Sequence, residues 1–246
     1  MNRRAILAAL PAFALLVCAA CTGSPGASRA GSEVVPPSAV VEFSVLYGQN
    51  CAGCHGANGE GGAAIALANP VFLAIADDTV IRRTAATGVP GTSMPAFAQS
   101  AGGMLTEKQI EALVRGIRSW AKPDALGNQI PPSYLAQGPG DPQRGADAYR
   151  IYCSSCHGPN GGGGSKASSI VDGSFLALVS DQSLRTIVIA GRPELGAPDW
   201  RGNVEGRPMS AQEISDVVAW LSSQRPTLPG RPYPIASANP ANGGSR

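Results

Sequence analysis

Two short stretches contain both histidines of this 246-residue chain and four of its six cysteines. They have the sequences CAGCHG at residues 51–56 and CSSCHG at residues 153–158. Two thiols three residues apart can each form a thioether with a haem vinyl group, and the histidine that follows can ligate the iron from one face. The sequence therefore predicts two covalently attached haem c groups, one at each stretch.

The residues predicted to bind these haems are Cys51, Cys54 and His55 in the first stretch and Cys153, Cys156 and His157 in the second. Other chemistry is open to such residues, because a C-x-x-C pair can be a redox-active dithiol and two pairs can bind one zinc ion. Zinc is disfavoured here, since the pairs lie 102 residues apart and each is followed directly by His-Gly, which zinc sites do not require.

The chain around the two stretches is an internal repeat. In turn, VLYGQNCAGCHGANGEGG aligns with DAYRIYCSSCHGPNGGGG, TGVPGTSMPAF with AGRPELGAPDW, and LTEKQIEALVRGIRSW with MSAQEISDVVAWLSSQ. Each copy thus carries a cysteine-histidine stretch, a glycine-rich loop, a middle segment and a closing helix. This pattern resembles the class I cytochrome c family over residues 38–122 and 142–226.

The resemblance implies an all-α protein of two tandem class I cytochrome c domains, residues 38–122 and 142–226. Residues 123–141 are rich in Pro and Gly without helical periodicity and are the predicted linker between them. Each domain is small for a self-supporting core, and a buried porphyrin would supply its centre.

Helices are expected on both sides of each copy: over residues 38–50 and 106–120 in the first, and over residues 141–152 and 210–224 in the second. The later helix of each copy has apolar residues three and four apart. Thr106 and Ser210 are the expected N-cap residues of these closing helices.

Class I cytochromes cross their first and last helices closely, which favours a small residue opposite an aromatic one. The second copy offers Gly145 in the first helix and Trp220 in the last, whereas the aligned positions of the first copy hold Phe43 and Gly116. We therefore expect the large and small partners to be exchanged between the copies.

The sixth ligand of the first iron is predicted from a methionine, because both histidines are already assigned. Met94 stands in GTSMPAF, which resembles the Met-Pro ligand loop of the family, and follows His55 by 39 residues. Met104 precedes the closing helix, where an apolar residue often packs against the helix start, and is expected in the core.

The second copy departs from this pattern. Ala197-Pro198 aligns with the Met-Pro pair, so the expected thioether is missing. Met209 is the only methionine of this copy and aligns with Leu105. We predict Met209 as the sixth ligand of the second iron; the alternative is that it packs beneath the closing helix.

The N-terminus resembles an export signal that ends in a lipoprotein cleavage site. Residues 1–20 combine two arginines, an apolar run and small residues before Cys21. Cys21 is the predicted lipidation site, and the alternative is ordinary signal cleavage. Residues 21–37 are expected to be a flexible tether and residues 227–246 a disordered tail.

Charge excludes one class of partner. Cleavage before Cys21 would remove Arg3 and Arg4, so the 19 basic residues would become 17 against 17 acidic ones. A formally neutral polypeptide gives no electrostatic support to nucleic-acid binding. After the signal, no stretch approaches the apolar length of a membrane helix, so a lipid anchor is the predicted membrane attachment.

The resemblance implies an exported electron carrier. A haem iron with His and Met ligands exchanges single electrons and has no open coordination position. We expect a dihaem cytochrome on the outer side of a bacterial membrane that relays single electrons between redox partner proteins, such as a membrane respiratory complex. The alternative is a dihaem enzyme, peroxidase-like or acting on sulfur compounds, or a gas-binding protein with an open second haem.

Overall fold

The computed structural model describes residues 35–226 of the chain. The chain divides into two units, residues 1–37 and residues 38–246. The predicted signal at 1–20, Cys21, most of the tether and the predicted tail lie outside the described residues.

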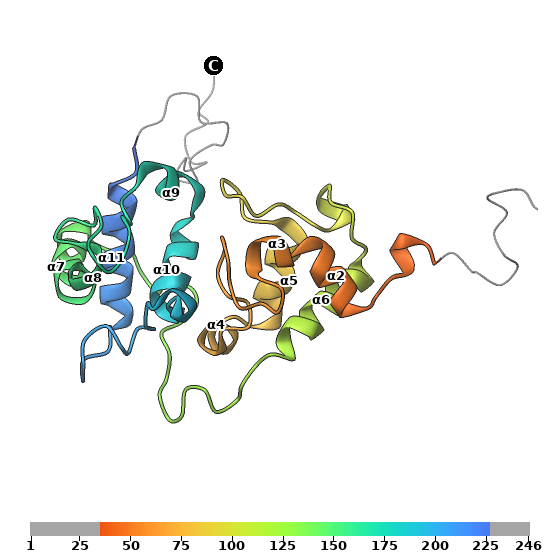
Figure 1. Cartoon of the computed structure of the whole chain (residues 1–246), viewed down its shortest axis with the longest axis horizontal. Helices are drawn as coiled ribbons and strands as arrows, with labels where there is room; N and C mark the ends of the chain where they lie inside the picture. Colours follow the sequence, from red (N-terminus) through yellow and green to blue (C-terminus); the bar gives the residue numbers. More distant parts are fainter. Residues whose placement is uncertain (1–34, 227–246) are drawn as a thin grey trace, which may run out of the picture. The chain divides into compact units, whose positions relative to one another are not determined.

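The described residues are helical and contain no strand, which confirms the all-α prediction (Figure 1). The first copy contains α2 (Phe43–Asn50), α3 (Ala52–His55), α4 (Pro70–Ile75), α5 (Asp78–Thr87) and α6 (Glu107–Arg118). The second contains α7 (Pro142–Tyr152), α8 (Ser154–His157), α9 (Gly173–Leu178), α10 (Asp181–Ala190) and α11 (Ala211–Ser223). Short 3-10 helices cover Pro37–Ala39, Gln99–Ala101 and Pro193–Leu195.

The first helix of each copy begins differently. Helix α7 begins at Pro142 behind the N-cap Asp141, whose carboxylate accepts hydrogen bonds from the next backbone N–H groups. Helix α2 begins at Phe43 rather than at the predicted residue 38, and its N-cap Glu42 makes no side-chain cap bond. The β-branched pair Val40 and Val41 precedes this start, and such residues favour extended backbone.

The closing helices begin where the sequence predicts. Thr106 caps α6 and Ser210 caps α11, each in a reciprocal capping box. In return, the backbone N–H of Thr106 donates to Gln109 Oε1 at 2.9 Å, and that of Ser210 donates to Glu213 Oε2 at 2.9 Å. Both predicted N-caps are therefore confirmed.

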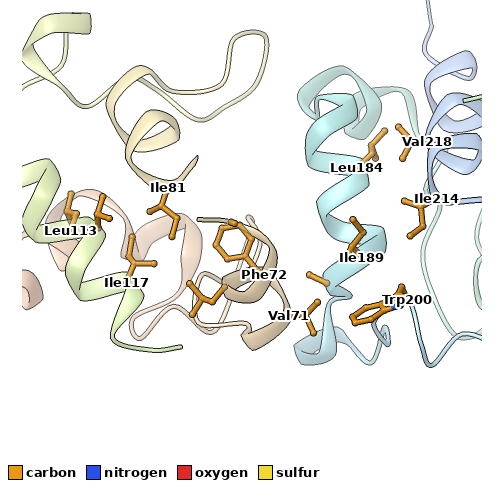
Figure 2. Packing of buried hydrophobic residues seen from close by; sticks show 14 of the residues in the cluster. Val71, Phe72, Ile81, Leu113, Ile117, Leu184, Ile189, Trp200, Ile214 and Val218 are labelled. Atoms are coloured by element: carbon orange, nitrogen blue, oxygen red, sulfur yellow. The ribbon is translucent and has the colours of Figure 1, made fainter. Parts of the chain in front are cut away.

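In each copy the helix before the middle segment packs apolar side chains against the closing helix, α5 against α6 and α10 against α11. In the first copy, Ile81 of α5 lies toward Leu113 and Ile117 of α6 (Figure 2). In the second copy the apolar side chains come from the facing sides of α10 and α11 and include Leu184, Ile189, Ile214 and Val218 (Figure 2). The corresponding helices of the two copies therefore form corresponding parts of the core.

The predicted exchange of small and large residues is present in both helix crossings. In the first copy, a Cβ on Gly116 of α6 would overlap the ring of Phe43 from α2. In the second, α7 and α11 lie against each other, and a Cβ on Gly145 would overlap the backbone carbonyl of Asp216 and meet Trp220 Cβ at 2.7 Å. Gly145 therefore makes room first for the backbone of α11 and only then for the tryptophan.

Aromatic rings fill the space at both helix crossings, although the small and large residues are exchanged between the copies. Trp120, just after α6, lies with its ring centroid 5.0 Å from that of Tyr47, and Trp220 of α11 lies 4.3 Å from Tyr149. Phe43 fills the remaining space beside Trp120, with centroids 5.2 Å apart. Each copy thus has a tryptophan against the equivalent tyrosine, although Trp220 lies within α11 and Trp120 lies just after α6.

The last part of the predicted linker is held by the second copy. Arg185 of α10 is buried and donates hydrogen bonds to the carbonyl oxygens of Ser133 and Tyr134 and to Ser215 Oγ. A buried guanidinium needs such acceptors, and two of them are backbone groups of the linker. This segment is therefore packed against α10.

The helix crossing predicts that Gly145 cannot be enlarged. We expect Gly145→Ala to lower the free energy of unfolding by about 1–3 kcal/mol, because the new methyl would push α7 away from α11. Unfolding in guanidinium chloride measures the change. The matched control is Gly48→Ala in α2, where a Cβ meets nothing within 4 Å, and alanine should stabilise the helix by up to about 1 kcal/mol.

A rescue experiment separates the two contacts of Gly145. Because the backbone of Asp216 is the nearer neighbour, adding Trp220→Gly to Gly145→Ala should restore little of the lost stability. Full recovery in the double variant would show that the tryptophan alone limits the size of residue 145.

Candidate haem sites

Each cysteine-histidine stretch forms one helical turn. Helices α3 and α8 end at His55 and His157, and the backbone N–H of each histidine donates to the carbonyl of the first cysteine, at 3.0 Å in both copies. The four cysteines of the two stretches are free thiols. The structure therefore brings two thiols and one imidazole together on a single turn, twice.

Both histidines are oriented by a backbone carbonyl. Nδ1 of His55 lies 2.8 Å from the carbonyl oxygen of Ile65, and Nδ1 of His157 lies 2.9 Å from that of Ser168. A carbonyl can only accept, so Nδ1 carries a proton, and in the neutral imidazole Nε2 is then the nitrogen with the free lone pair. This is the usual arrangement of a metal-binding histidine, in which the second ring nitrogen is fixed by an acceptor.

A glycine after each histidine lets the chain turn back to provide that carbonyl. Gly56 has φ +83° and Gly158 has φ +78°. A Cβ on Gly56 would lie 2.5 Å from the carbonyl oxygen of Gly61. The returning loop is then tied to the histidine, since the N–H of Gly61 donates to His55 O at 2.8 Å.

A tyrosine joins the first helix of each copy to this turn. The hydroxyl of Tyr47 donates to Gly56 O at 2.8 Å, and that of Tyr149 donates to Gly158 O. The tryptophans cover the same loops: a Cβ on Gly59 would lie 2.5 Å from the Trp120 ring. The helix crossing and the histidine turn are therefore one packed unit.

The electrostatics of the thiols disfavour a redox dithiol. Burial, with a smaller effect of the second cysteine of each pair, raises the pKa of Cys51 to about 11 and that of Cys153 to about 12. Reactive C-x-x-C pairs instead have a cysteine of lowered pKa. Burial also lowers the pKa of His55, against its hydrogen bond to Ile65, which favours the neutral ring that a metal ligand needs.

A shared zinc site is also disfavoured. Within residues 35–226, no three His, Cys, Asp or Glu side chains gather closely enough to hold a metal ion. The two cysteine pairs therefore act as separate sites. Two thiols and a fixed imidazole on one turn are the donors that haem c needs.

Met94 lies in a loop between α5 and α6. Its N–H is 3.2 Å from Thr92 Oγ1, and its carbonyl accepts from the N–H of Val89 at 3.0 Å. The side chain is partly buried. These contacts fix the backbone on both sides of the predicted ligand, and ligation by Met94 stays a prediction.

The other two methionines have different environments. Met209 is buried, with 2% of its surface exposed, and belongs to the apolar core. Met104 is 82% exposed, so its predicted place in the core is wrong. Leu105, the next residue, fills that place with 6% exposed. Ligation by Met209 stays a prediction that these contacts do not test.

The repeat agrees with a known protein family. The family model described as cytochrome c oxidase, cbb3-type, subunit III matches residues 38–115 and 140–221, together more than half of the chain. The chain belongs to this family. It is a c-type cytochrome of electron transfer, and it carries covalently bound haem c.

Two relatives of this chain are also named as cytochrome c subunits. The chain is 23% identical over 232 residues to the cytochrome bc1 complex cytochrome c subunit of Corynebacterium efficiens, covering 90% of this chain and 75% of the relative. The subunit of the same name from Mycobacterium tuberculosis is 24% identical over 181 residues, which are 72% of this chain and 60% of that protein.

Solved structures are more distant. A reducing HAO-like protein complex from Kuenenia stuttgartiensis matches with a TM-score of 0.43 and 21% identity, covering 79% of this chain and all of that chain. Such a low score supports no argument about this cytochrome. Between residues 35 and 226, no helix has the length and apolar character needed to cross a membrane.

Sequence reasoning missed the residues that support the histidines. The signal for the tyrosines was present, because Tyr47 and Tyr149 each stand four residues before the first cysteine of their copy. The carbonyl acceptors on Ile65 and Ser168 carried no such signal, since every residue has a carbonyl and only the fold of the loop selects one.

The glycine turn predicts a sharp difference between two nearby glycines of this cytochrome. We expect Gly56→Ala to cost about 1–3 kcal/mol of folding stability, because residue 56 has a positive φ and its Cβ would press on Gly61. Guanidinium unfolding of the haem-loaded protein measures this change.

The control for this prediction lies three residues earlier. Gly53 is in α3, and a Cβ there meets nothing within 4 Å. Gly53→Ala should leave the unfolding midpoint unchanged or raise it slightly. Equal effects of the two substitutions would contradict the role of the turn.

Proposed function

We propose that this cytochrome binds two haem c groups, in domains over residues 38–122 and 142–226, and passes single electrons between redox proteins outside the cytoplasm. The observation that carries the proposal is the repeated orientation of the histidines. In both copies the imidazole follows two free thiols on one turn and donates Nδ1–H to a carbonyl of the loop that returns past it.

The chain's residues have distinct roles in this proposal. When bound, haem c supplies an iron that changes oxidation state by one electron. Cys51 and Cys54, and their counterparts Cys153 and Cys156, would attach the porphyrin. Nε2 of His55 and of His157 would ligate the irons, held in place by the Nδ1 hydrogen bonds. Met94 would complete the coordination of the first iron.

A rigid surrounding suits electron transfer. The histidine, its glycine turn, the tyrosine and the crossing helices are linked by hydrogen bonds and ring contacts in each copy. Residues held in place in this way would let a bound haem change its oxidation state with little movement of the protein, so little reorganisation would oppose the electron transfer. The names of the relatives favour this function over the dihaem enzyme.

The proposed partners are redox proteins of a respiratory membrane. The relatives are named as subunits of the cytochrome bc1 complex, and we propose a donor and an acceptor of that kind for this chain. Residues 1–20 would direct export, and acyl chains on Cys21 would attach the protein to the membrane. The balanced charge of the exported polypeptide gives no support to nucleic-acid binding.

The number of haems can be counted by mass. The exported wild-type protein should carry two covalent haems, and replacing Cys51 and Cys54 with Ala should remove one while the second remains. The reason is that each copy has its own pair of thiols and its own histidine. Intact-mass spectrometry of the purified protein makes the measurement.

Two controls accompany the count. Replacing Cys153 and Cys156 with Ala should also remove one haem, whereas Cys21→Ser should remove none. A wild-type protein without haem adducts, or loss of both haems from either double variant, would contradict two independent sites.

Anchoring is tested by fractionation. Cys21→Ser should move the cytochrome from the membrane to the soluble fraction, because acyl chains would be its attachment. Membranes washed in high salt and probed for haem distinguish the two states. A variant that stays on washed membranes would argue against lipid attachment through Cys21.

A further inference from the structure

The loop that carries Met94 has a counterpart in the second copy with the same register. Helices α5 and α10 each end at a glycine of positive φ, Gly88 with +66° and Gly191 with +69°. A Cβ on Gly88 would lie 2.6 Å from the carbonyl carbon of Pro95, and one on Gly191 would lie 2.5 Å from that of Pro198. The two prolines are thus equivalent, and the residues before them are Met94 and Ala197.

A second fixed point lies at the other end of the loop. The N–H of Leu105 donates to Phe97 O at 2.7 Å, and the N–H of Met209 donates to Trp200 O at 2.9 Å. In each copy the next residue is the N-cap of the closing helix. Met209 therefore occupies the position of Leu105, and not that of Met94.

The side chain of Met209 has the surroundings of a core residue. It is as buried as Leu105 and lies in the apolar cluster. Its sulfur is 3.9 Å from Nδ2 of Asn203, which also donates to Asp199 O at 3.2 Å. Methionine and leucine replace each other readily in cores, so packing alone accounts for this residue.

Lysine is the other residue type that could ligate the second iron, and the lysine of this copy lies in the loop that contacts His157. Lys166 is the only lysine in residues 142–226 and is exposed. Its loop is the one that fixes His157, because Gly164 N donates to Ala167 O and Ser168 O accepts from the imidazole. A ligand on the opposite face of the iron would have to come from the loop around Ala197, whose side chain has no donor atom.

From this juxtaposition we propose that the second haem has no side-chain ligand opposite His157, and that its ferrous iron binds small neutral diatomic molecules. At Ala197 a methyl group stands where the first copy has the thioether of Met94, so this position offers no ligand. The proposal rests on the proposed function only in that Cys153, Cys156 and His157 hold a haem.

Carbon monoxide is the probe for an open ferrous position. The full-length cytochrome with two haems, reduced with dithionite, should bind about one equivalent of carbon monoxide for its two haems, seen as a shift of the Soret band. Ala197→Met should restore a thioether at the position equivalent to Met94 and reduce binding to less than about a tenth of that amount.

Met209→Leu separates packing from ligation. We expect this variant to bind the same amount of carbon monoxide as the wild type and to keep its unfolding midpoint, because leucine fills the aligned position in the first copy. Wild-type protein that binds no carbon monoxide would overturn the proposal. If Met209→Leu then gained binding, Met209 would be identified as the ligand.

The haem count keeps this test separate from that of the proposed function. Intact mass on the same samples shows whether both haems are attached. A second haem that is absent contradicts the proposed function, whereas a second haem that is present and does not bind carbon monoxide contradicts only the open position.

Discussion

The hydrogen bond from each histidine to a backbone carbonyl is the constraint on which the rest of the structure depends. Because the cysteines place the imidazole on a single turn, a segment beyond that turn must supply the acceptor for Nδ1. The chain meets this requirement by reversing at Gly56 and Gly158, so that Ile65 and Ser168 return to the histidines. The glycine-rich composition of the loops follows from this reversal.

The crossing of the first and last helices supports the same turn. Tyr47 and Tyr149 connect the first helices to the reversal through their hydroxyls, and a tryptophan packs against each tyrosine. The two copies reach this contact differently. In one copy Phe43 lies against a glycine of α6, and in the other Gly145 admits the backbone of α11. Both copies keep the contact between the tyrosine and a tryptophan ring, but the tryptophan comes from a different position in each copy.

The features that are predictable from sequence are those with a local chemical signature. The cysteine-histidine turns, the capping residues Thr106 and Ser210, and the alternation of helices all depend on neighbours in the chain, and the structure has them. The start of α2 at Phe43 and the exposure of Met104 were predicted wrongly. The first depends on the β-branched pair Val40 and Val41, which favours extended backbone before Phe43. The second depends on which of two adjacent apolar residues packs in the core, and periodicity does not decide between Met104 and Leu105.

The hydrogen bonds that hold the linker against α10 could not be predicted from the sequence either. Arg185 lies in α10, for which no helix was predicted, and two of its acceptors are carbonyls about fifty residues earlier. A carbonyl leaves no mark in the sequence. Long-range contacts to the backbone are therefore the part of this fold that sequence reasoning does not reach.

The contacts that the two copies share surround the histidine turn or join the helices. The glycine turn, the tyrosine, the tryptophan and the closing helix are present in both copies, whereas Met94 in one copy is Ala197 in the other at the same place in the loop. The loop keeps its register because Gly88 and Gly191 pack against the following prolyl peptide, and not because of the side chain before it. The residue before the proline can therefore change without disturbing the loop, which would let two copies of one domain provide different ligands to their haems.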